Sequence, residues 1–341
     1  MLSTLTKNPS VSAIIPCYNH GKYLSTALDA IINQSLVPDA IYVIDDASTD
    51  NTSAVIKKYA QLYPNIIPIF QDKNLGCNAS VNRALALVET EYVFFCAADD
   101  YILPNMLKHT LPLLKRHHQA GLCSGLCYIG TQNSWYRQKP ASPRISTNNG
   151  FVSAQKAQDY YNKNGSWFWG AATIFKVSSV LKYGGFDPEL DGFADSTLSM
   201  MIALQEGCCF VPEYLAVWTK DENSMASRSQ KDLDFSIFAV GKIEKMVTSS
   251  FEDAIARKLL RGYVLRWACS ILVHGSGKEA LKNKKFQDKI VSYSGSALIG
   301  LLIVQKIIPK PLKRLSYFLI LRWRELPGVL GRRILRVEMR I

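Results

Sequence analysis

Short apolar runs alternate with amphipathic segments along the first hundred residues. The runs are rich in β-branched and aromatic side chains, which is typical of buried strands. They cover residues 11–15, 40–44, 66–70 and 92–96. Between the runs, apolar positions recur on one helical face and predict helices. These are the segment with Leu24, Leu28, Ile31 and Ile32, residues 52–62 and residues 79–88. This alternation predicts an α/β fold with a mainly parallel central sheet and helices on both faces.

Beyond the fourth strand the predicted elements are more widely spaced. In order, they are a loop at residues 134–149, a strand at 167–175, a turn at 184–187, a helix at 197–205 and a strand at 210–218. Pro212 indicates that the last of these strands lies at a sheet edge, because proline lacks a backbone N–H. Residues 235–270 are predominantly helical in pattern. We therefore expect a domain over residues 1–225 and a helical C-terminal region over 226–341.

Polar side chains follow three of the predicted strands directly. Tyr18 and Asn19 come after the first strand, the pair Asp45-Asp46 after the second, and the pair Asp99-Asp100 after the fourth. In open α/β sheets, ligands bind beyond the carboxyl ends of the strands. The three clusters are therefore expected to meet at one edge of the sheet.

The acidic pairs suggest phosphate chemistry that uses a cation. Asp99 and Asp100 repel each other unless solvent or a cation lies nearby, and a divalent ion could bridge them to a diphosphate. The alternative is a helix N-cap before Pro104. Asp45 and Asp46 precede a run typical of a helix start, and a carboxylate there can accept a hydrogen bond from a base or a ribose. Tyr18 offers a ring that either stacks on a base or packs ordinarily.

Several other nucleotide-binding and catalytic motifs do not occur in the sequence. It contains no Gly-x-Gly-x-x-Gly after the first strand, no P-loop and no Gly-x-Ser-x-Gly elbow. This disfavours dinucleotide-binding, P-loop and α/β-hydrolase chemistry.

Composition and charge add to this picture. The eight cysteines form no Cys-x-x-Cys pair, and most lie in apolar runs, so we expect buried free thiols. The net charge of +12 comes mainly from the last forty residues. No recognised nucleic-acid motif accompanies that charge, so nucleic acid is not the expected partner.

Four motifs together resemble the family 2 glycosyltransferases of the GT-A fold. They are residues 11–19, residues 43–52, Asn74-Leu75-Gly76 with Asn82, and residues 97–100. The resemblance covers about residues 10–220. It implies inverting transfer of a sugar from a nucleotide diphosphate, by default UDP, with Mg2+ or Mn2+. It also implies that residues 10–105 bind the nucleotide sugar and residues 106–225 face the acceptor.

The resemblance also assigns residues to the donor site. The nucleotide-sugar residues it implies are Pro16, Tyr18, Asn19, Asp45, Asp46, Asn74, Gly76, Asn82 and Asp99. Tyr18 and Asp46 look like base contacts. Asp99 looks like the metal-binding acid, with Asp100 beside it. Many members carry a further acid at the position of Ala97, so that contact must come from elsewhere.

The catalytic base is the second role that the resemblance implies. In the family a Glu-Asp pair follows a Gly-Gly-Phe-Asp turn, and here the pair reads Ala194-Asp195. Inversion needs a carboxylate to take the proton of the acceptor hydroxyl. Asp195 is the expected base and Asp191 its local rival. By position alone, Asp195 could equally cap the following helix.

The acceptor side carries an aromatic cluster. No Gln-x-x-Arg-Trp motif occurs, so addition of a single sugar is expected. Trp167, Phe168 and Trp169 lie near the expected acceptor side, where they either stack on sugar rings or, as strand residues usually do, fill the core.

The C-terminal region suggests a membrane surface. Residues 297–308 and 315–323 are apolar, and Lys and Arg flank them. Pro309, Pro311 and Pro327 break the region into helices too short to span a bilayer. Such helices lie on anionic lipid, unless they pack on the catalytic domain. With no apolar N-terminal signal, we expect a cytoplasmic protein, peripheral on the inner face of the plasma membrane.

These expectations point to synthesis of a surface polysaccharide or glycolipid, with a glycan or a lipid-linked acceptor. Two alternatives remain. One is a sugar-phosphate nucleotidyltransferase, although residues 16–19 lack the glycine-rich basic loop such enzymes use. The other is a catalytically weak nucleotide-binding scaffold on the same fold, suggested by Ala97 and Ala194.

Overall fold

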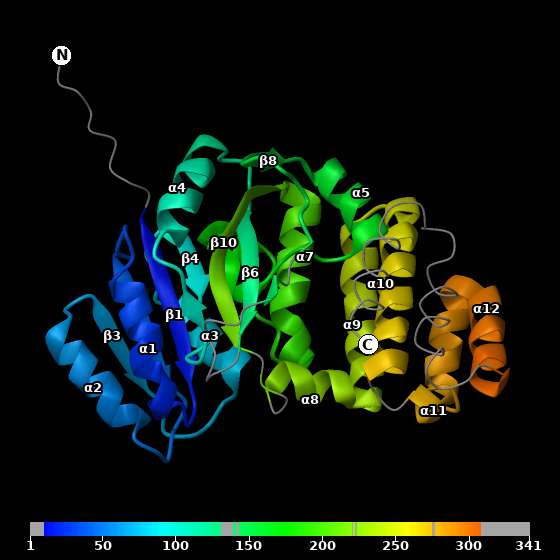
Figure 1. Cartoon of the computed structure of the whole chain (residues 1–341), viewed down its shortest axis with the longest axis horizontal. Helices are drawn as coiled ribbons and strands as arrows, with labels where there is room; N and C mark the ends of the chain where they lie inside the picture. The colour runs from blue at the N-terminus through cyan, green and yellow to red at the C-terminus, as the bar shows by residue number, and fades with distance from the viewer. Residues whose placement is uncertain are drawn as a thin grey trace. The chain divides into compact units, whose positions relative to one another are not determined.

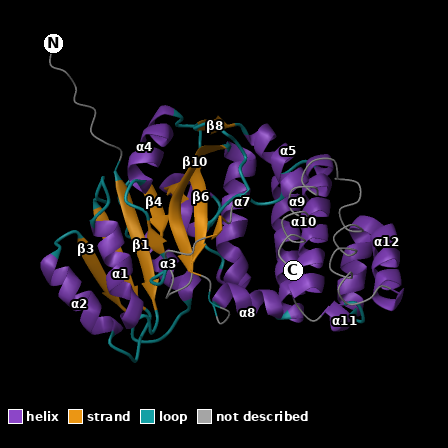
Figure 2. Ribbon diagram, in the orientation of Figure 1, coloured by secondary structure: helices purple, strands orange, loops and turns teal. Residues whose placement is uncertain are grey.

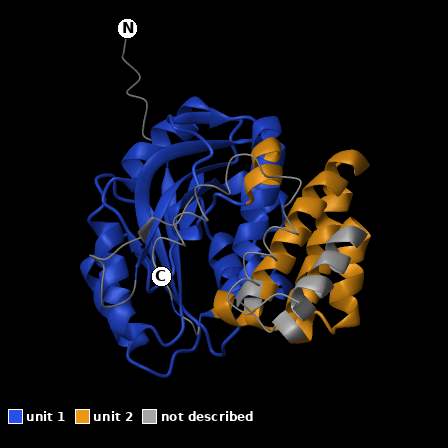
Figure 3. Cartoon of the chain, turned by 45° about the vertical axis from the view of Figure 1, so that its right-hand side comes forward, with its two compact units in different colours: residues 1–157, 166–224 blue, residues 158–165, 225–341 orange. Residues whose placement is uncertain are grey.

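The computed structural model describes residues 10–130, 139–140, 143–219, 221, 224–274 and 277–307 (Figure 1). The chain forms two compact units (Figure 3). The first comprises Met1–Ala157 and Ser166–Ser224, and the second comprises Gln158–Gly165 and Met225–Ile341. The short segment 158–165 thus joins the C-terminal unit although it lies far from it in the sequence.

The predicted strands of the first hundred residues form the parallel half of the sheet. They are β1 (Val11–Cys17), β2 (Ala40–Asp45), β3 (Ile66–Phe70) and β4 (Tyr92–Phe95). Their order is β3-β2-β1-β4, and each pair is parallel. Cys17 lies opposite Asp45 in the register, so the residues that follow β1 and β2 leave the sheet at the same level.

Helices flank this half of the sheet, as the alternation predicts (Figure 2). They are α1 (Gly21–Ile32), α2 (Thr52–Leu62) and α3 (Cys77–Leu85). The apolar face predicted for α1 is buried, with Leu24, Leu28 and Ile31 fully enclosed. The α3 helix begins at Cys77, directly after Gly76, whose φ of +86° ends the preceding loop.

The other half of the sheet is mixed. Its main strands are β9 (Thr173–Lys176), β6 (Leu122–Gly130) and β10 (Cys208–Thr219). Short strands β5 (Tyr101–Ile102), β7 (Lys139–Pro140) and β8 (Gly150–Val152) join them. The β9 strand runs antiparallel to both β4 and β6, whereas β10 is parallel to β6.

The predicted edge position of the strand around Pro212 is wrong. The β10 strand pairs with β6 on one side, and with β8 and β5 on the other. The register between β10 and β6 shifts between Val211 and Tyr214. This bulge accommodates the missing N–H of Pro212 inside the sheet.

The remaining elements of the first unit shape its acceptor half. They are α4 (Met106–Arg116), α5 (Ala154–Asn164), η1 (Gly170–Ala172), α6 (Val177–Lys182), η2 (Pro188–Phe193) and α7 (Ala194–Glu206), of which α5 continues into the second unit. The strand predicted from residue 167 begins only at Thr173, because residues 167–169 form no regular element and η1 follows them. The predicted helix near residue 197 begins earlier, at Ala194.

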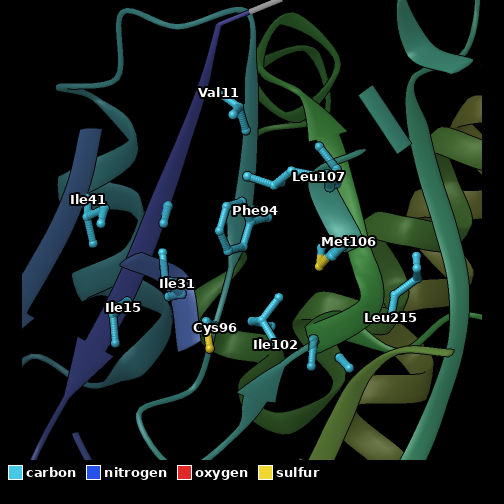
Figure 4. Close-up of a cluster of buried hydrophobic side chains, with 14 of the residues drawn as sticks. Val11, Ile15, Ile31, Ile41, Phe94, Cys96, Ile102, Met106, Leu107 and Leu215 are labelled. Carbon is cyan, nitrogen blue, oxygen red and sulfur yellow. The ribbon is translucent and has the colours of Figure 1, made fainter. Parts of the chain in front are cut away.

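One apolar cluster holds the sheet of the first unit to its helices (Figure 4). Ile15, Ile31, Ile41, Phe94 and Leu107 are fully buried in it. Burial of such side chains stabilises the fold by about 1.5–3 kcal/mol each. The strand ends that carry the polar clusters therefore rest on a rigid support.

The second unit is helical, as predicted. Its helices are α8 (Met225–Lys231), α9 (Leu233–Ser250), α10 (Asp253–His274), α11 (Gly277–Ala280) and α12 (Lys284–Ile307), with a break in α12 at Ser294. They enclose a separate core that includes Val264, Ala268 and Phe286. Among the described residues, no helix is both long and apolar enough to cross a membrane. The basic residues predicted to bind lipid beyond 307 lie outside the described part of the chain.

Candidate active site

The loops after β1 and β2 are tied together by Asn19. Its backbone N–H donates to Ser48 Oγ at 2.9 Å, and its Oδ1 accepts from the Thr49 N–H at 2.8 Å. Asn19 and Ala47 both have positive φ, 55° and 59°, which is uncommon for residues with a side chain. Tyr18 precedes this junction and leaves 45% of its surface exposed. Pro16 lies within β1 and is partly buried.

Asp45 is buried and organises the start of α2. Its Oδ1 accepts from the Ser48 N–H at 2.9 Å, and its Oδ2 accepts from the Ser53 hydroxyl. Both carboxylate oxygens therefore already have partners within the loop after β2. Asp45 therefore holds the loop after β2 in place.

Asp46 is also buried, and it fixes the turn before α3. Its Oδ1 accepts from the Leu75 N–H at 2.7 Å and its Oδ2 from the Gly76 N–H at 2.8 Å. Asn74 Oδ1 shares the Gly76 N–H at 2.9 Å. The three motif residues Asp46, Asn74 and Gly76 thus meet in one hydrogen-bonded turn.

Gln71 supports Asp46 and was not predicted from the sequence. Its Nε2 donates to Asp46 Oδ1 and to Ser80 Oγ, both at 2.7 Å, and its Oε1 accepts from Arg83 Nη1 at 3.0 Å. Its position directly after β3 could have indicated this role. The sequence analysis considered polar residues only after the first, second and fourth strands.

Asp99 and Asp100 lie in a tight turn closed by β10. The Asp100 N–H donates to Ala97 O at 3.0 Å. Thr219, the last residue of β10, donates its N–H to Asp100 Oδ1 at 2.8 Å and its hydroxyl to Asp99 O at 2.6 Å. The alternative of a helix cap is wrong, because α4 begins at Met106 with Asn105 at its N-cap.

The two acids differ in exposure and electrostatics. Asp100 is buried, and burial followed by the charge of Asp99 raises its pKa well above the usual value. Asp99 is partly exposed; burial raises its pKa and the charge of Asp221 adds to this, while His20 opposes it. Asp99 is therefore the acid of the pair that can reach a ligand.

Two asparagines of α3 hold the segment before α7. Asn82 Nδ2 donates to Phe186 O at 2.6 Å, and its Oδ1 accepts from the Phe186 N–H at 2.9 Å. One turn earlier, Asn78 Nδ2 donates to Asp191 O at 3.0 Å. Asp191 has a φ of 43° and a ψ of −121°, so this contact holds a strained residue. The described partners of Asn82 are thus main-chain groups of Phe186. Asn78 was not among the site residues predicted from the sequence.

Asp195 lies in the first turn of α7. The N-cap position belongs to Phe193, so Asp195 is not the cap, although its Oδ1 accepts from the Ser196 N–H at 2.6 Å. Its Oδ2 faces Gly170, where a Cβ would come within 3.0 Å. The side chain reaches solvent, yet the surrounding protein removes enough water to raise the pKa of its carboxyl.

The thiol of Cys77, at the start of α3, is affected by the charges of several of these acids. Part of Cys77 is exposed, yet the surrounding protein removes enough water from its thiol to raise the pKa to about 12, and the charges of Asp195, Asp46, Asp191 and Asp99 add to the rise. Those four acids come from the end of β2, the end of β4 and the segment around α7. Hydrogen bonds tie the end of β2 to the start of α3 through Asp46, and tie α3 to the segment before the candidate base through Asn78. The other seven thiols are buried, as expected.

The acids suit a metal that arrives with a diphosphate. Within the described residues, no group of three or more His, Cys, Asp or Glu is arranged to hold an ion by itself. Mg2+ usually binds proteins through one or two carboxylates together with substrate phosphates. Asp99 matches that donor set, because its carboxylate is partly exposed and the charge of Asp221 is close enough to affect its pKa. Asp100 is already engaged by Thr219.

Known proteins resemble this chain in sequence. Residues 12–184 match the model of "Glycosyl transferase family 2". The uncharacterized glycosyltransferase YibD of Escherichia coli is 32% identical over 127 residues, 37% of either chain. The minor teichoic acid biosynthesis protein GgaB of Bacillus subtilis is 33% identical over 112 residues, which are 32% of this chain and 12% of GgaB. The matches therefore span well under two thirds of these relatives.

The fold also matches a solved structure. The structure of S. aureus TarS 1-349 in complex with UDP-GlcNAc superposes with a TM-score of 0.66 at 20% identity, covering 93% of this chain and 92% of the other. At that identity the likeness establishes the GT-A fold. Because the family model covers about half of the chain, and the fold agrees with it, the chain belongs to glycosyl transferase family 2.

Proposed function

We propose that this protein transfers a single sugar from a nucleotide diphosphate sugar, with UDP as the nucleotide, to a hydroxyl group of its acceptor with inversion. The observation that carries the proposal is the meeting of two motif segments at the start of α3, where Asp46 holds the Leu75 and Gly76 N–H groups and Asn78 holds Asp191, four residues before Asp195. This contact supports a single site for the nucleotide, the diphosphate and the catalytic base. That TarS was solved with UDP-GlcNAc supports the choice of UDP.

In the proposed donor complex, the nucleobase of the donor stacks on the ring of Tyr18, a residue that is 45% exposed. Asp46 acts indirectly, by holding the Leu75 and Gly76 amides in place. Asn19 fixes the loop that carries Tyr18. These residues bind and orient the nucleotide.

Asp99 would hold Mg2+ or Mn2+ against the diphosphate. A bound divalent ion would neutralise the charge that develops on the departing diphosphate. The turn closed by Thr219 fixes Asp99 for this role, and the buried Asp100 anchors the turn.

Asp195 is the proposed base. As the acceptor oxygen bonds to the anomeric carbon, Asp195 takes the proton of that hydroxyl, and the bond to the diphosphate oxygen breaks with its electron pair leaving on the diphosphate. A raised pKa brings the carboxylate closer to the working pH, which suits a general base. Asp191, whose backbone is held by Asn78, shapes the site beside it.

The proposed acceptor is either a glycan or a lipid-linked molecule that takes part in the synthesis of a surface polysaccharide or glycolipid. A relative, GgaB, takes part in minor teichoic acid biosynthesis, and this supports a surface polymer. The basic residues beyond 307 would place the protein on an anionic membrane at the cytoplasmic side.

UDP release from a panel of UDP-sugars, with Mn2+ or with EDTA, tests this function. We expect release with at least one donor in Mn2+, and loss of about 100-fold or more in Asp195→Asn because a general base contributes at least that much. UDP binding should survive that change. Release that persists undiminished in Asp195→Asn would reject Asp195 as the base.

A catalytically weak scaffold is the second candidate, because Ala97 and Ala194 replace acids that many family members carry. Ala194 is buried, so a longer acidic side chain there would need rearrangement of the α7 N-terminus. The scaffold predicts UDP binding with no release from any donor, even with extracted acceptors.

A further inference from the structure

Two tryptophans from distant segments meet beside the candidate site. Trp169 precedes η1, and Trp218 is the penultimate residue of β10. Their ring centroids lie 5.1 Å apart, with 46° between the planes. Both pack partly against the main core and both remain partly exposed. Trp167, by contrast, is fully buried and serves the core.

The chain neighbours of this pair connect it to both groups of acids. Gly170 follows Trp169, and its position beside Asp195 Oδ2 leaves only 3.0 Å for a Cβ. Thr219 follows Trp218 and bonds to both Asp99 and Asp100. Each ring is thus one residue away from a contact with a proposed catalytic or metal-binding acid.

The chemistry of the pair suits a sugar ring. Partly exposed indoles present apolar faces with a polar N–H at the edge, and such amphipathic surfaces are favoured at binding sites. Leaving two of the largest aromatic side chains partly uncovered costs hydrophobic stabilisation that a ligand would recover. The C–H face of a pyranose fits an aromatic ring while its hydroxyl groups stay available to the neighbouring carboxylates.

We propose that Trp169 and Trp218 form the subsite for the saccharide ring of the acceptor, so that the acceptor presents a pyranose hydroxyl to Asp195. This inference rests on the proposed function and extends it, because it names the acceptor group as a sugar ring rather than a bare lipid or polyol.

Titration with a panel of p-nitrophenyl pyranosides, with and without UDP and Mn2+, tests the subsite. Calorimetry on wild type, Trp169→Leu and Trp218→Leu reports binding, and the same variants are assayed for transfer kinetics. We expect each Leu variant to raise the pyranoside Kd and the acceptor KM about tenfold, with the UDP Kd changed less than twofold. Trp218→Phe should restore most of the affinity, and Phe238→Leu, an exposed aromatic of the second unit, should match wild type.

Several results would overturn the subsite. They are an unchanged pyranoside Kd in both Leu variants, binding of none of the pyranosides to wild type, or equally tight binding of cyclohexanol, which offers an apolar ring without the sugar's hydroxyl pattern. Absence of UDP binding or release in wild type would instead reject the proposed donor function, while the pyranoside titration would still decide the subsite.

Discussion

At the scale of single residues, the acids of the site divide into those that build it and those that can reach a ligand. Asp45, Asp46 and Asp100 are buried and accept hydrogen bonds from their own protein. Asp99 and Asp195 are the more exposed. The sequence marked all five by their position after strands or in a motif, but it could not separate these roles, because burial depends on residues such as Thr219 that arrive from elsewhere in the chain.

Replacing Asp46 tests its role as the anchor of the turn before α3. Asp46→Asn puts an amide NH2 where one oxygen now accepts an N–H, and therefore loses at least one hydrogen bond to Leu75 or Gly76. We expect a loss of about 1–3 kcal/mol in the free energy of unfolding, together with weaker UDP binding. Chemical denaturation and calorimetry measure the two effects, and full retention of UDP affinity would contradict the assignment.

Asp100 predicts an effect of pH on stability. Its pKa is raised in the folded state, so the native protein holds the proton more tightly than the unfolded chain does. Its charge therefore costs stability as pH rises above the unfolded value near 4, and the cost is complete above the folded pKa. Asp100→Asn should then be more stable than wild type at pH 8, by on the order of 1 kcal/mol, with the gain fading toward acidic pH. Thermal unfolding across that range measures it; a gain equal at all pH values would contradict the account.

At the scale of elements, α3 links the proposed donor loops to the segment that carries the proposed base, Asp195. Asp46 fixes the loop just before α3, and the first and second turns of α3 hold Asp191 and Phe186 through Asn78 and Asn82. The strands and helices of the first hundred residues were predictable because their apolar periods are clear. The contacts of α3 with the segment before α7 were not predictable, because they join residues more than a hundred positions apart in the sequence. Asn82 was instead predicted to contact the nucleotide sugar. The interior position of β10 was missed for a similar reason, since the bulge at Pro212 appears only in the paired sheet.

The α3 link predicts a separation of catalysis from donor binding. Asn82→Ala removes both hydrogen bonds to Phe186 and should loosen the segment that leads to Asp195. We expect kcat to fall about tenfold or more, because small misplacements of a catalytic group are costly, while the UDP Kd stays within about twofold. The control is Asn33→Ala, which removes an exposed hydrogen bond from Asn33 Nδ2 to Asp29 O at the C-terminal end of α1. A loss of UDP affinity as large as the loss in kcat would contradict this account and would support a direct contact between Asn82 and the nucleotide.

At the scale of the whole molecule, a GT-A unit is followed by a helical unit with its own core. The sequence predicted the helical character of the second unit from its periodicity. It did not predict that residues 158–165 belong to that unit, because their pattern continues α5 and carries no boundary signal.

The basic C-terminal residues predict binding to anionic vesicles. Replacing Lys310, Lys313 and Arg314 by Glu should abolish flotation with phosphatidylglycerol vesicles near physiological salt, because each basic residue contributes about 1 kcal/mol at such a surface. Neutral phosphatidylcholine vesicles should bind neither form. Equal flotation of both proteins on the anionic vesicles would show that this charge is not the anchor.

UDP release by Asp99→Asn in Mn2+ is the most direct measurement of the central claim, that acids from separate strand ends act on one donor diphosphate. The fold should be retained, because the main-chain carbonyl of Asp99, not its carboxylate, bonds to Thr219. The account predicts a loss of about 100-fold or more in turnover, since charge stabilisation at a departing group commonly contributes that much. Donor turnover equal to wild type would contradict it.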